Sequence, residues 1–126
     1  MEVNQLIQGL QHIGIPTYSV EETCHFYRQF GFAVDWSDES GDPVFLKNAS
    51  CVLEIYHSDH PNQCDGGIDH IALRVNDIEE AYRYVTSLGY QALEGKICRN
   101  QVYSNGSCYF TIVGLNHEKI EFSQIM

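Results

Sequence analysis

Two segments of the chain align with each other without a gap, at a constant offset of 58 residues. They are residues 9–32 and residues 67–90. Most of their apolar positions carry similar side chains, and six positions are identical: Gly9/Gly67, His12/His70, Ile13/Ile71, Glu21/Glu79, Glu22/Glu80 and Gly31/Gly89. Chance seldom gives such matches together with matching element boundaries. The sequence therefore predicts two modules that fold in the same way.

Each repeat begins with the pattern of a strand and continues with that of a helix. Residues 10–17 and 68–75 are short, apolar and rich in β-branched side chains, which is typical of strands. Ser19 and Asp77 follow them, each with a glutamate three residues later, and this spacing is typical of a helix N-cap. We expect the helices to bury apolar stripes, which are Val20, Cys24, Tyr27 and Phe30, and then Ile78, Ala81, Val85 and Leu88.

The helices are expected to end at Gly31 and Gly89, which tolerate the left-handed conformation. Further strand-like segments follow: residues 33–36, 44–47 and 51–57, and then 91–97, 107–113 and 119–125, with a last turn at 114–117. The predicted fold class is α+β, with two tandem βαβββ modules that form a cupped eight-stranded sheet carrying its helices on the outer face. One domain, residues 1–126, would hold module one (about 8–57), a linker (about 58–66) and module two (about 67–126).

Four polar side chains lie within these apolar strands, on the face opposite the apolar side chains. Strand alternation places His12 and His70 opposite the apolar side chains that must face each helix. In the closing strands, Glu54 and Glu121 likewise lie opposite the apolar side chains. Each module therefore directs one histidine and one glutamate away from its helix.

Two imidazoles and two carboxylates are good ligands for a first-row divalent metal, and their formal charge balances a dication. Taken singly, each residue has a simpler interpretation, because a strand histidine is often a satisfied core residue and a strand glutamate often faces solvent. A carboxylate within an apolar strand is costly unless it is paired or bound to a cation. The joint pattern favours a metal site.

Charge and cysteine usage exclude several other classes of protein. The net charge is -10, and only 7 Lys+Arg oppose 17 Asp+Glu, so nucleic acid is not an expected ligand. No apolar run reaches the length of a membrane span, and the start lacks the pattern of a secretory signal. The five cysteines are odd in number and lack a C-x-x-C pair, which indicates reduced thiols. We therefore expect a cytoplasmic domain with no nucleic-acid or membrane partner.

In order and spacing, five short segments resemble the glyoxalase/bleomycin-resistance/extradiol-dioxygenase superfamily, also called the vicinal oxygen chelate fold. They are residues 10–15 (LQHIGI), 26–32 (FYRQFGF), 52–56 (VLEIY), 68–73 (IDHIAL) and 110–122 (FTIVGLNHEKIEF). The resemblance covers the chain from about residue 8 to residue 125.

The resemblance implies a metal held between two modules, often across a homodimer interface. One site would then use His12 and Glu54 of one subunit with His70 and Glu121 of the other. This ligand set is similar to that of glyoxalase I (lactoylglutathione lyase) at all four positions. The short chain resembles the bacterial branch, which implies nickel or cobalt, with zinc as a further possibility.

The implied reaction is a lyase or isomerase step, a proton transfer next to a metal-bound carbonyl, for example in a hemithioacetal of methylglyoxal. Glu121 is the expected base, and Glu54 is a ligand and the second candidate for this catalytic role. Three alternatives remain open: a 2-epimerase or a dioxygenase of the same fold, and a non-catalytic dimer that binds a drug.

Two positions depart from the glyoxalase I pattern and put the use of glutathione in doubt. Pro16 stands where that family has an arginine for a glutathione carboxylate, and Ser58 stands where it has an asparagine. Arg74, four residues after His70, is a substitute anion clamp or an ordinary solvent-facing arginine. Aromatic side chains that could line a pocket, or simply pack, are Trp36, Tyr56, Tyr103 and Tyr109; Tyr56 and Arg74 are the predicted substrate-binding residues.

Overall fold

The computed structural model describes residues 2–29, 31–114 and 118–126. It divides into two units: residues 12–69, here called the first unit, and residues 1–11 with 70–126, here called the second unit. Strand β1 (Ile7–Thr17) contributes residues to both. In the part of the chain described, no helix is long and apolar enough to cross a membrane.

The first unit contains the end of β1 and four further elements: α1 (Val20–Arg28), β2 (Ala33–Ser37), β3 (Val44–Asn48) and β4 (Cys51–His57). Its strands are ordered β2-β3-β4-β1. The β1–β4 pair is parallel, whereas β2–β3 and β3–β4 are antiparallel. The long connection between the parallel strands holds the helix, as a parallel pair requires.

The second unit repeats this plan. It contains a 3-10 turn (Val3–Gln5), the start of β1, and then β5 (His70–Val75), α2 (Ile78–Ser87), β6 (Cys98–Asn100), β7 (Ser107–Val113) and β8 (Lys119–Ile125). Its strands after β1 are ordered β5-β8-β7-β6. Again the pair next to the helix connection, β5–β8, is parallel, whereas β7–β8 and β6–β7 are antiparallel. The predicted strand–helix–three-strand repeat is present in both units.

The predicted signals bound both helices. The Ser19 side chain accepts a hydrogen bond from the backbone N–H of Glu22, and Asp77 does the same for Glu80. Gly31 and Gly89 follow the helices with φ angles of 87° and 96°. A side chain at either position would be strained, which explains why glycine ends each helix.

Each helix packs on the apolar face of its own unit. Cys24 of α1 is buried in a core with Val44, Leu46, Leu53 and Ile55. The α2 side chains are buried in a core that consists of Leu6, Val75, Ile78, Ala81, Val85, Phe110, Ile112 and Phe122. Leu88, predicted to be in the α2 stripe, is instead 56% exposed because it follows the last helical residue as the C-cap. The predicted contribution of Phe30 lies outside the described residues.

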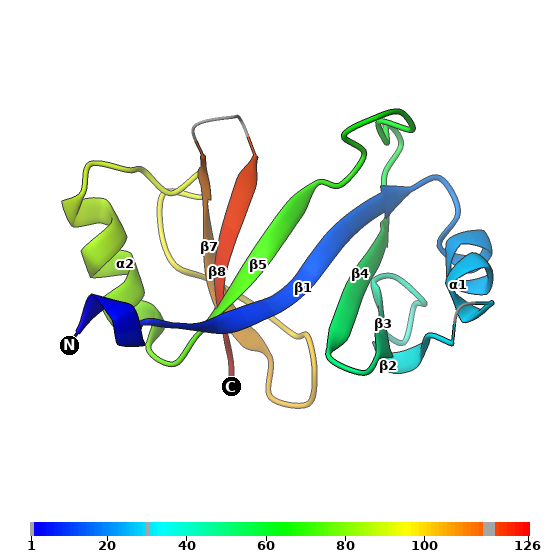
Figure 1. Ribbon diagram of the computed structural model, residues 1–126, viewed down its shortest axis with the longest axis horizontal. Coiled ribbons are helices and arrows are strands. Elements are labelled where there is room, and N and C mark those ends of the chain that lie inside the picture. Colours follow the sequence, from blue (N-terminus) through cyan, green and yellow to red (C-terminus); the bar gives the residue numbers. More distant parts are fainter. Residues whose placement is uncertain (1, 30, 115–117) are drawn as a thin grey trace. The chain divides into compact units, whose positions relative to one another are not determined.

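The beginning of the chain packs with the second unit. Leu6 is only 2% exposed and belongs to the α2 core, and Gln11 Nε2 donates to the Ser123 carbonyl at 3.4 Å. Figure 1 shows this segment, in blue, beside α2. The sequence did not predict this packing. Residues 7–17 form one continuous strand, and nothing in the repeat indicates that the first residues of this strand belong to the second unit.

The predicted strand over residues 91–97 is wrong. The first strand after α2 is β6, which starts only at Cys98. Nearby, Leu93 N–H donates to the Thr111 carbonyl at 2.7 Å, and the Thr111 N–H donates to Glu94 Oε1 at 2.8 Å. A side-chain carboxylate thus replaces the second backbone partner that a strand would supply. Of the predicted turn at 114–117, residues 115–117 lie outside the described part of the chain.

Candidate functional site

The first unit holds one histidine–glutamate pair. His12 on β1 is 3% exposed, and its Nε2 lies 3.4 Å from Oε1 of Glu54 on β4. The edge of Phe45 packs against the imidazole, with ring centroids 5.2 Å apart and an interplanar angle of 85°. The imidazole is therefore held in place by aromatic packing while one nitrogen faces the carboxylate.

Strand register explains why these two side chains meet. Gly14 lies directly opposite Glu54 in the parallel β1–β4 pair. His12 precedes Gly14 by two residues and so shares its face of the strand. Glycine leaves the position between the imidazole and the carboxylate without a side chain, so the diagonal contact can form.

The second unit holds a pair of the same construction. Ala72 lies opposite Glu121 in the parallel β5–β8 pair, and His70 precedes Ala72 by two residues. His70 Nε2 is 3.8 Å from Glu121 Oε1, and the two side chains are 10% and 17% exposed. Ala72, like Gly14 in the first unit, is too small to separate the pair.

The chemistry of these pairs suits a shared cation. Imidazole nitrogens and carboxylate oxygens bind first-row divalent metals at about 2.0–2.2 Å, so two neighbouring ligands of one metal lie about 3–3.5 Å apart. The distances of 3.4 Å and 3.8 Å are close to this and longer than a strong hydrogen bond. His12, His70 and Glu121 each offer a ligand atom of the kind that holds a metal ion. Each unit therefore carries one imidazole and one carboxylate of the kind that binds a divalent metal.

The two predicted substrate-binding residues lie on the same faces as these pairs. Arg74 is exposed on β5, four residues after His70 and opposite Ser123. Tyr56 is half-buried on β4, two residues after Glu54. Their role in substrate binding stays a prediction, although alternation places each beside its unit's pair.

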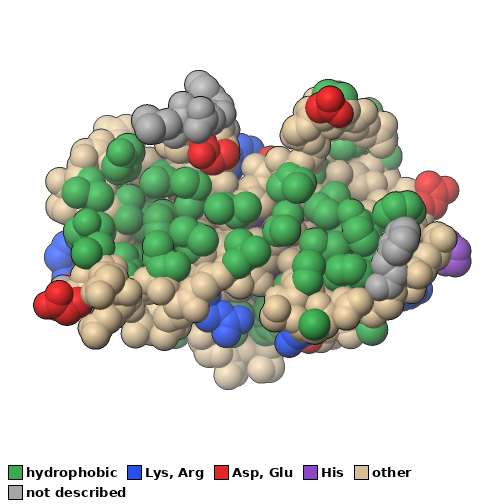
Figure 2. Space-filling view, viewed as in Figure 1, with side chains coloured by type: hydrophobic (Ala, Val, Ile, Leu, Met, Phe, Trp, Pro, Cys, Tyr) green, Lys and Arg blue, Asp and Glu red, His purple; other side chains and the backbone are tan. Residues whose placement is uncertain are grey.

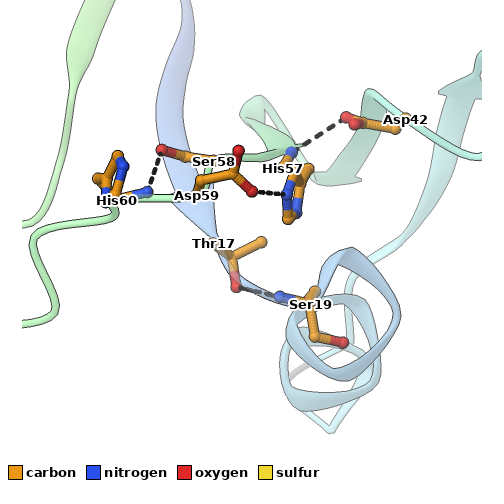
Figure 3. A network of polar contacts seen from close by, with 7 residues as sticks. All are labelled: Thr17, Ser19, Asp42, His57, Ser58, Asp59 and His60. Atoms are coloured by element: carbon orange, nitrogen blue, oxygen red, sulfur yellow. Dashed lines mark hydrogen bonds and ion pairs between the residues drawn. The ribbon is translucent and has the colours of Figure 1, made fainter.

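Beyond β4 the chain forms a polar loop. His57 Nε2 lies 2.9 Å from Asp59 Oδ1, the His57 N–H donates to Asp42, and the His60 N–H donates to the Ser58 hydroxyl (Figure 3). The hydrogen bond with Asp59 raises the pKa of His57 above its ordinary value. The Asp59 side chain is 84% exposed and that of His57 is 47% exposed. These groups have the exposure of a solvated loop.

Sequence reasoning missed Phe45 at the first pair and did not connect Trp36 with it. Phe45 was not considered a site residue, yet it packs against His12 and lies opposite Glu54 in the β3–β4 register. Trp36 was considered only as a general candidate, and it packs edge-on to Phe45. No sequence motif indicates either contact, because both contacts depend on how β2 pairs with β3 and how β3 pairs with β4.

Comparisons with known proteins agree with this architecture. Residues 9–104 match the family described as "Glyoxalase/Bleomycin resistance protein/Dioxygenase superfamily". Among curated proteins, none matches the sequence significantly.

Solved structures show the same fold. Methylmalonyl-CoA epimerase from Mycobacterium tuberculosis has a TM-score of 0.81 and 17% identity, covering 100% of this chain and 93% of its own. The Mn(II)-bound glyoxalase from Novosphingobium aromaticivorans has a TM-score of 0.67 and 16% identity, covering 94% of this chain and 39% of its own. The 2,3-dioxygenase LapB from Pseudomonas sp. KL28 has a TM-score of 0.68 and 20% identity, covering 95% of this chain and 41% of its own. At such identities the likeness shows the fold alone, which is the predicted α+β fold with an eight-stranded sheet and two helices.

Proposed function

Because the chain belongs to the glyoxalase/bleomycin resistance protein/dioxygenase superfamily, we propose that it is a metal-dependent enzyme of the glyoxalase type. Such a lyase or isomerase transfers a proton at a carbon next to a carbonyl group. The observation that carries this proposal is the repeated pair: His12 with Glu54, and His70 with Glu121, in the same register in both units.

In this proposal the four residues hold one divalent cation, with nickel or cobalt favoured and zinc possible. The two neutral imidazoles and two carboxylates balance a charge of +2, which offsets the cost of burying carboxylates between apolar neighbours. The two pairs come together either from one chain or from two subunits of a homodimer. Both arrangements require one metal per subunit.

When bound, the cation supplies a Lewis acid for two vicinal oxygens of the substrate. Glu121 takes the carbon-bound proton and returns it to the neighbouring carbon, and Glu54 is the second candidate for this base. The Glu121 side chain is 17% exposed, so a small molecule can reach it. Arg74 would bind an anionic group of the substrate, and Tyr56 would form part of its wall.

The proposed homodimer is supported by exposed apolar side chains. In the second unit, Ile7, Leu10 and Ile71 are 45%, 55% and 37% exposed, and in the first unit Phe26 is 51% exposed. Figure 2 shows apolar side chains gathered into broad green areas on one face. Areas of this kind often mark protein–protein contacts.

The test begins with protein purified without added metal and then reconstituted with nickel, cobalt or zinc. We expect one equivalent of metal per subunit, lost in both His12→Ala and Glu121→Ala. We also expect an ultraviolet assay with methylglyoxal and a panel of thiols to show thioester formation by at least one reconstituted form. No turnover with any thiol would remove the glyoxalase activity, and no metal binding under any condition would favour a drug-binding dimer.

A second candidate is a 2-epimerase, because the epimerase structure covers the whole of this chain with a TM-score of 0.81. Epimerisation also begins with removal of a proton next to a carbonyl group, at the α-carbon of an acyl thioester, but a proton is then returned to the opposite face of the same carbon. The discriminating measurement is exchange of that proton with deuterated solvent, followed by NMR on methylmalonyl-CoA. A dioxygenase would instead need iron and would consume oxygen, which an oxygen electrode detects.

A further inference from the structure

Strand β2 carries a bulge beside the first histidine–glutamate pair. In the β2–β3 register, Val34 lies opposite Leu46, whereas Trp36 lies opposite Phe45, and the shift occurs between Val34 and Trp36. Asp35 is thus the extra residue of the bulge. A bulge of this kind re-aims the side chains that follow it, and bulges are enriched next to active sites.

The bulge decides which face of the sheet Trp36 occupies. Without it, alternation would keep Trp36 on the face of Val34 and Leu46, and Leu46 belongs to the core under α1. With it, Trp36 shares the face of Phe45, and Phe45 lies opposite Glu54. The indole is therefore moved from the helix face to the face that holds the metal-ligand pair.

Three rings then follow one another on this face. The Trp36 and Phe45 centroids are 6.2 Å apart at 65°, and the Phe45 and His12 centroids are 5.2 Å apart at 85°. Phe45 is 2% exposed, whereas Trp36 is half-buried. Phe45 therefore supports the other two rings from within the sheet, and Trp36 is the ring that a small molecule can contact.

In the second unit, a different kind of side chain lies opposite the carboxylate. Thr111, not an aromatic residue, lies opposite Glu121 in the β7–β8 register. The β6 residues pair only with Ser107 to Tyr109, so this edge strand does not reach Thr111. An aromatic residue directly opposite the carboxylate in the strand register is thus a feature of the first unit, and the repeated fold does not require it.

We propose that Trp36, supported by Phe45, is a specificity-determining residue that binds a planar apolar group of the substrate, such as an aryl ring. The inference rests on the proposed function, because the oxygens of the same substrate would bind at the metal held by His12 and Glu54. The substrate class is then an aryl-substituted oxygen chelate rather than one that carries only a methyl group. Aromatic pairs gain affinity beyond the area that they bury, which favours such a group.

Lactate and 3-phenyllactate test this directly, because they share one charge and one pair of vicinal oxygens and differ by a phenyl ring. Titration calorimetry with nickel-loaded and metal-free protein measures both dissociation constants. We expect 3-phenyllactate to bind about tenfold more tightly than lactate. Trp36→Ala should bring the ratio of the two dissociation constants close to one without changing lactate binding. Trp36→Phe should keep most of the wild-type ratio.

Tyr90→Ala is the matched control, since Tyr90 is an aromatic residue of the second unit that is 46% exposed. It should leave the ratio unchanged. Trp36 is the single tryptophan, so quenching of wild-type fluorescence by 3-phenyllactate gives a second readout.

Three results would overturn the inference: equal affinities in the wild type, a ratio that survives in Trp36→Ala, or binding of neither acid to either form of the protein. Failure of the proposed function is separate, because it appears as absence of nickel binding or as absence of turnover in the ultraviolet assay. The ratio measured on metal-free protein then still decides the role of Trp36.

Discussion

The two units are alike where they position their histidine–glutamate pairs and differ at their edge strands. In both, a parallel strand pair brings a histidine and a glutamate together across a small residue, Gly14 or Ala72. The edge strands differ in length and regularity: β2 covers Ala33–Ser37 and contains a bulge, whereas β6 covers only Cys98–Asn100. The carboxylates also have different neighbours, Phe45 of β3 opposite Glu54 and Thr111 of β7 opposite Glu121.

This difference shows how a repeated fold can produce an asymmetric site. A central strand pairs on both sides, so a change of register there would turn every following side chain to the opposite face. An edge strand pairs on one side only and tolerates bulges and shortening. The central parallel pairs thus fix the two histidine–glutamate pairs, whereas the residues opposite the carboxylates on β3 and β7, and the edge strands β2 and β6, differ between the units.

The largest expected effect is on catalysis, and it tests whether the two carboxylates have different roles. If Glu121 is the base, Glu121→Gln lowers kcat about 10²- to 10⁴-fold, because the amide cannot accept the proton. Glu54→Gln should lower kcat less and act mainly through metal affinity. Steady-state kinetics at saturating metal, with whichever substrate turns over, measures both.

The control is metal content, determined for each variant under the assay conditions. A larger loss of kcat in Glu54→Gln than in Glu121→Gln, at equal metal content, would reverse the assignment of the base. Equal losses would contradict any division of roles between the two pairs.

Much of the repeated part was predictable from the sequence, because it depends on local signals. The constant offset, the caps at Ser19 and Asp77 and the strand alternation together predicted the modules and the facing of the glutamates. The superfamily assignment followed from the same segments. Whether the four ligands share one metal stays a prediction.

The asymmetric part was not predictable, because it depends on contacts between segments distant in the sequence. The strand expected over residues 91–97 is absent, since Glu94 satisfies Thr111 through its side chain. The facing of Trp36 depends on a bulge that simple alternation does not indicate. Leu6 packs under α2 although the repeat does not include it.

The next largest effect concerns the cores, which differ in composition between the units. Phe110 is 0% exposed and packs between Phe122 and Tyr82, with centroids 5.0 Å and 5.1 Å away. We expect Phe110→Ala to lower the free energy of unfolding by about 3–5 kcal/mol, and Leu46→Ala in the first unit by about 2–5 kcal/mol. Urea denaturation measures both.

Leu93→Ala serves as the control, because Leu93 is 56% exposed and should change stability by less than about 0.5 kcal/mol. A single transition in both core variants would show that the two units unfold together. A loss below about 1 kcal/mol for Phe110→Ala would contradict the packing described for the second unit.

A smaller effect is expected where a carboxylate replaces an edge strand. Glu94→Ala removes the acceptor of the Thr111 N–H, and we expect a loss of about 1.5 kcal/mol in unfolding free energy. Glu94→Gln keeps an acceptor oxygen and should lose less. Glu39→Ala, at an exposed position of the first unit, is the control and should be nearly neutral. Equal losses in the alanine and glutamine variants would show that charge, and not the hydrogen bond, stabilises this edge.

The smallest expected effect is on the pH dependence of stability. It concerns the last residue of β4, the titratable His57, whereas the last residue of β8 is Ile125, which does not titrate. The hydrogen bond with Asp59 raises the pKa of His57 above 6.5, so the folded state binds the proton more tightly than the unfolded chain does. This contribution is fully present below the unfolded pKa and is lost as the pH rises through the folded pKa. His57→Gln should therefore destabilise the protein more at about pH 5 than at about pH 8.5. Urea denaturation at both values measures this. Asp59→Asn should reproduce the effect, and a penalty that grows with pH would show that the His57–Asp59 contact does not favour the protonated ring.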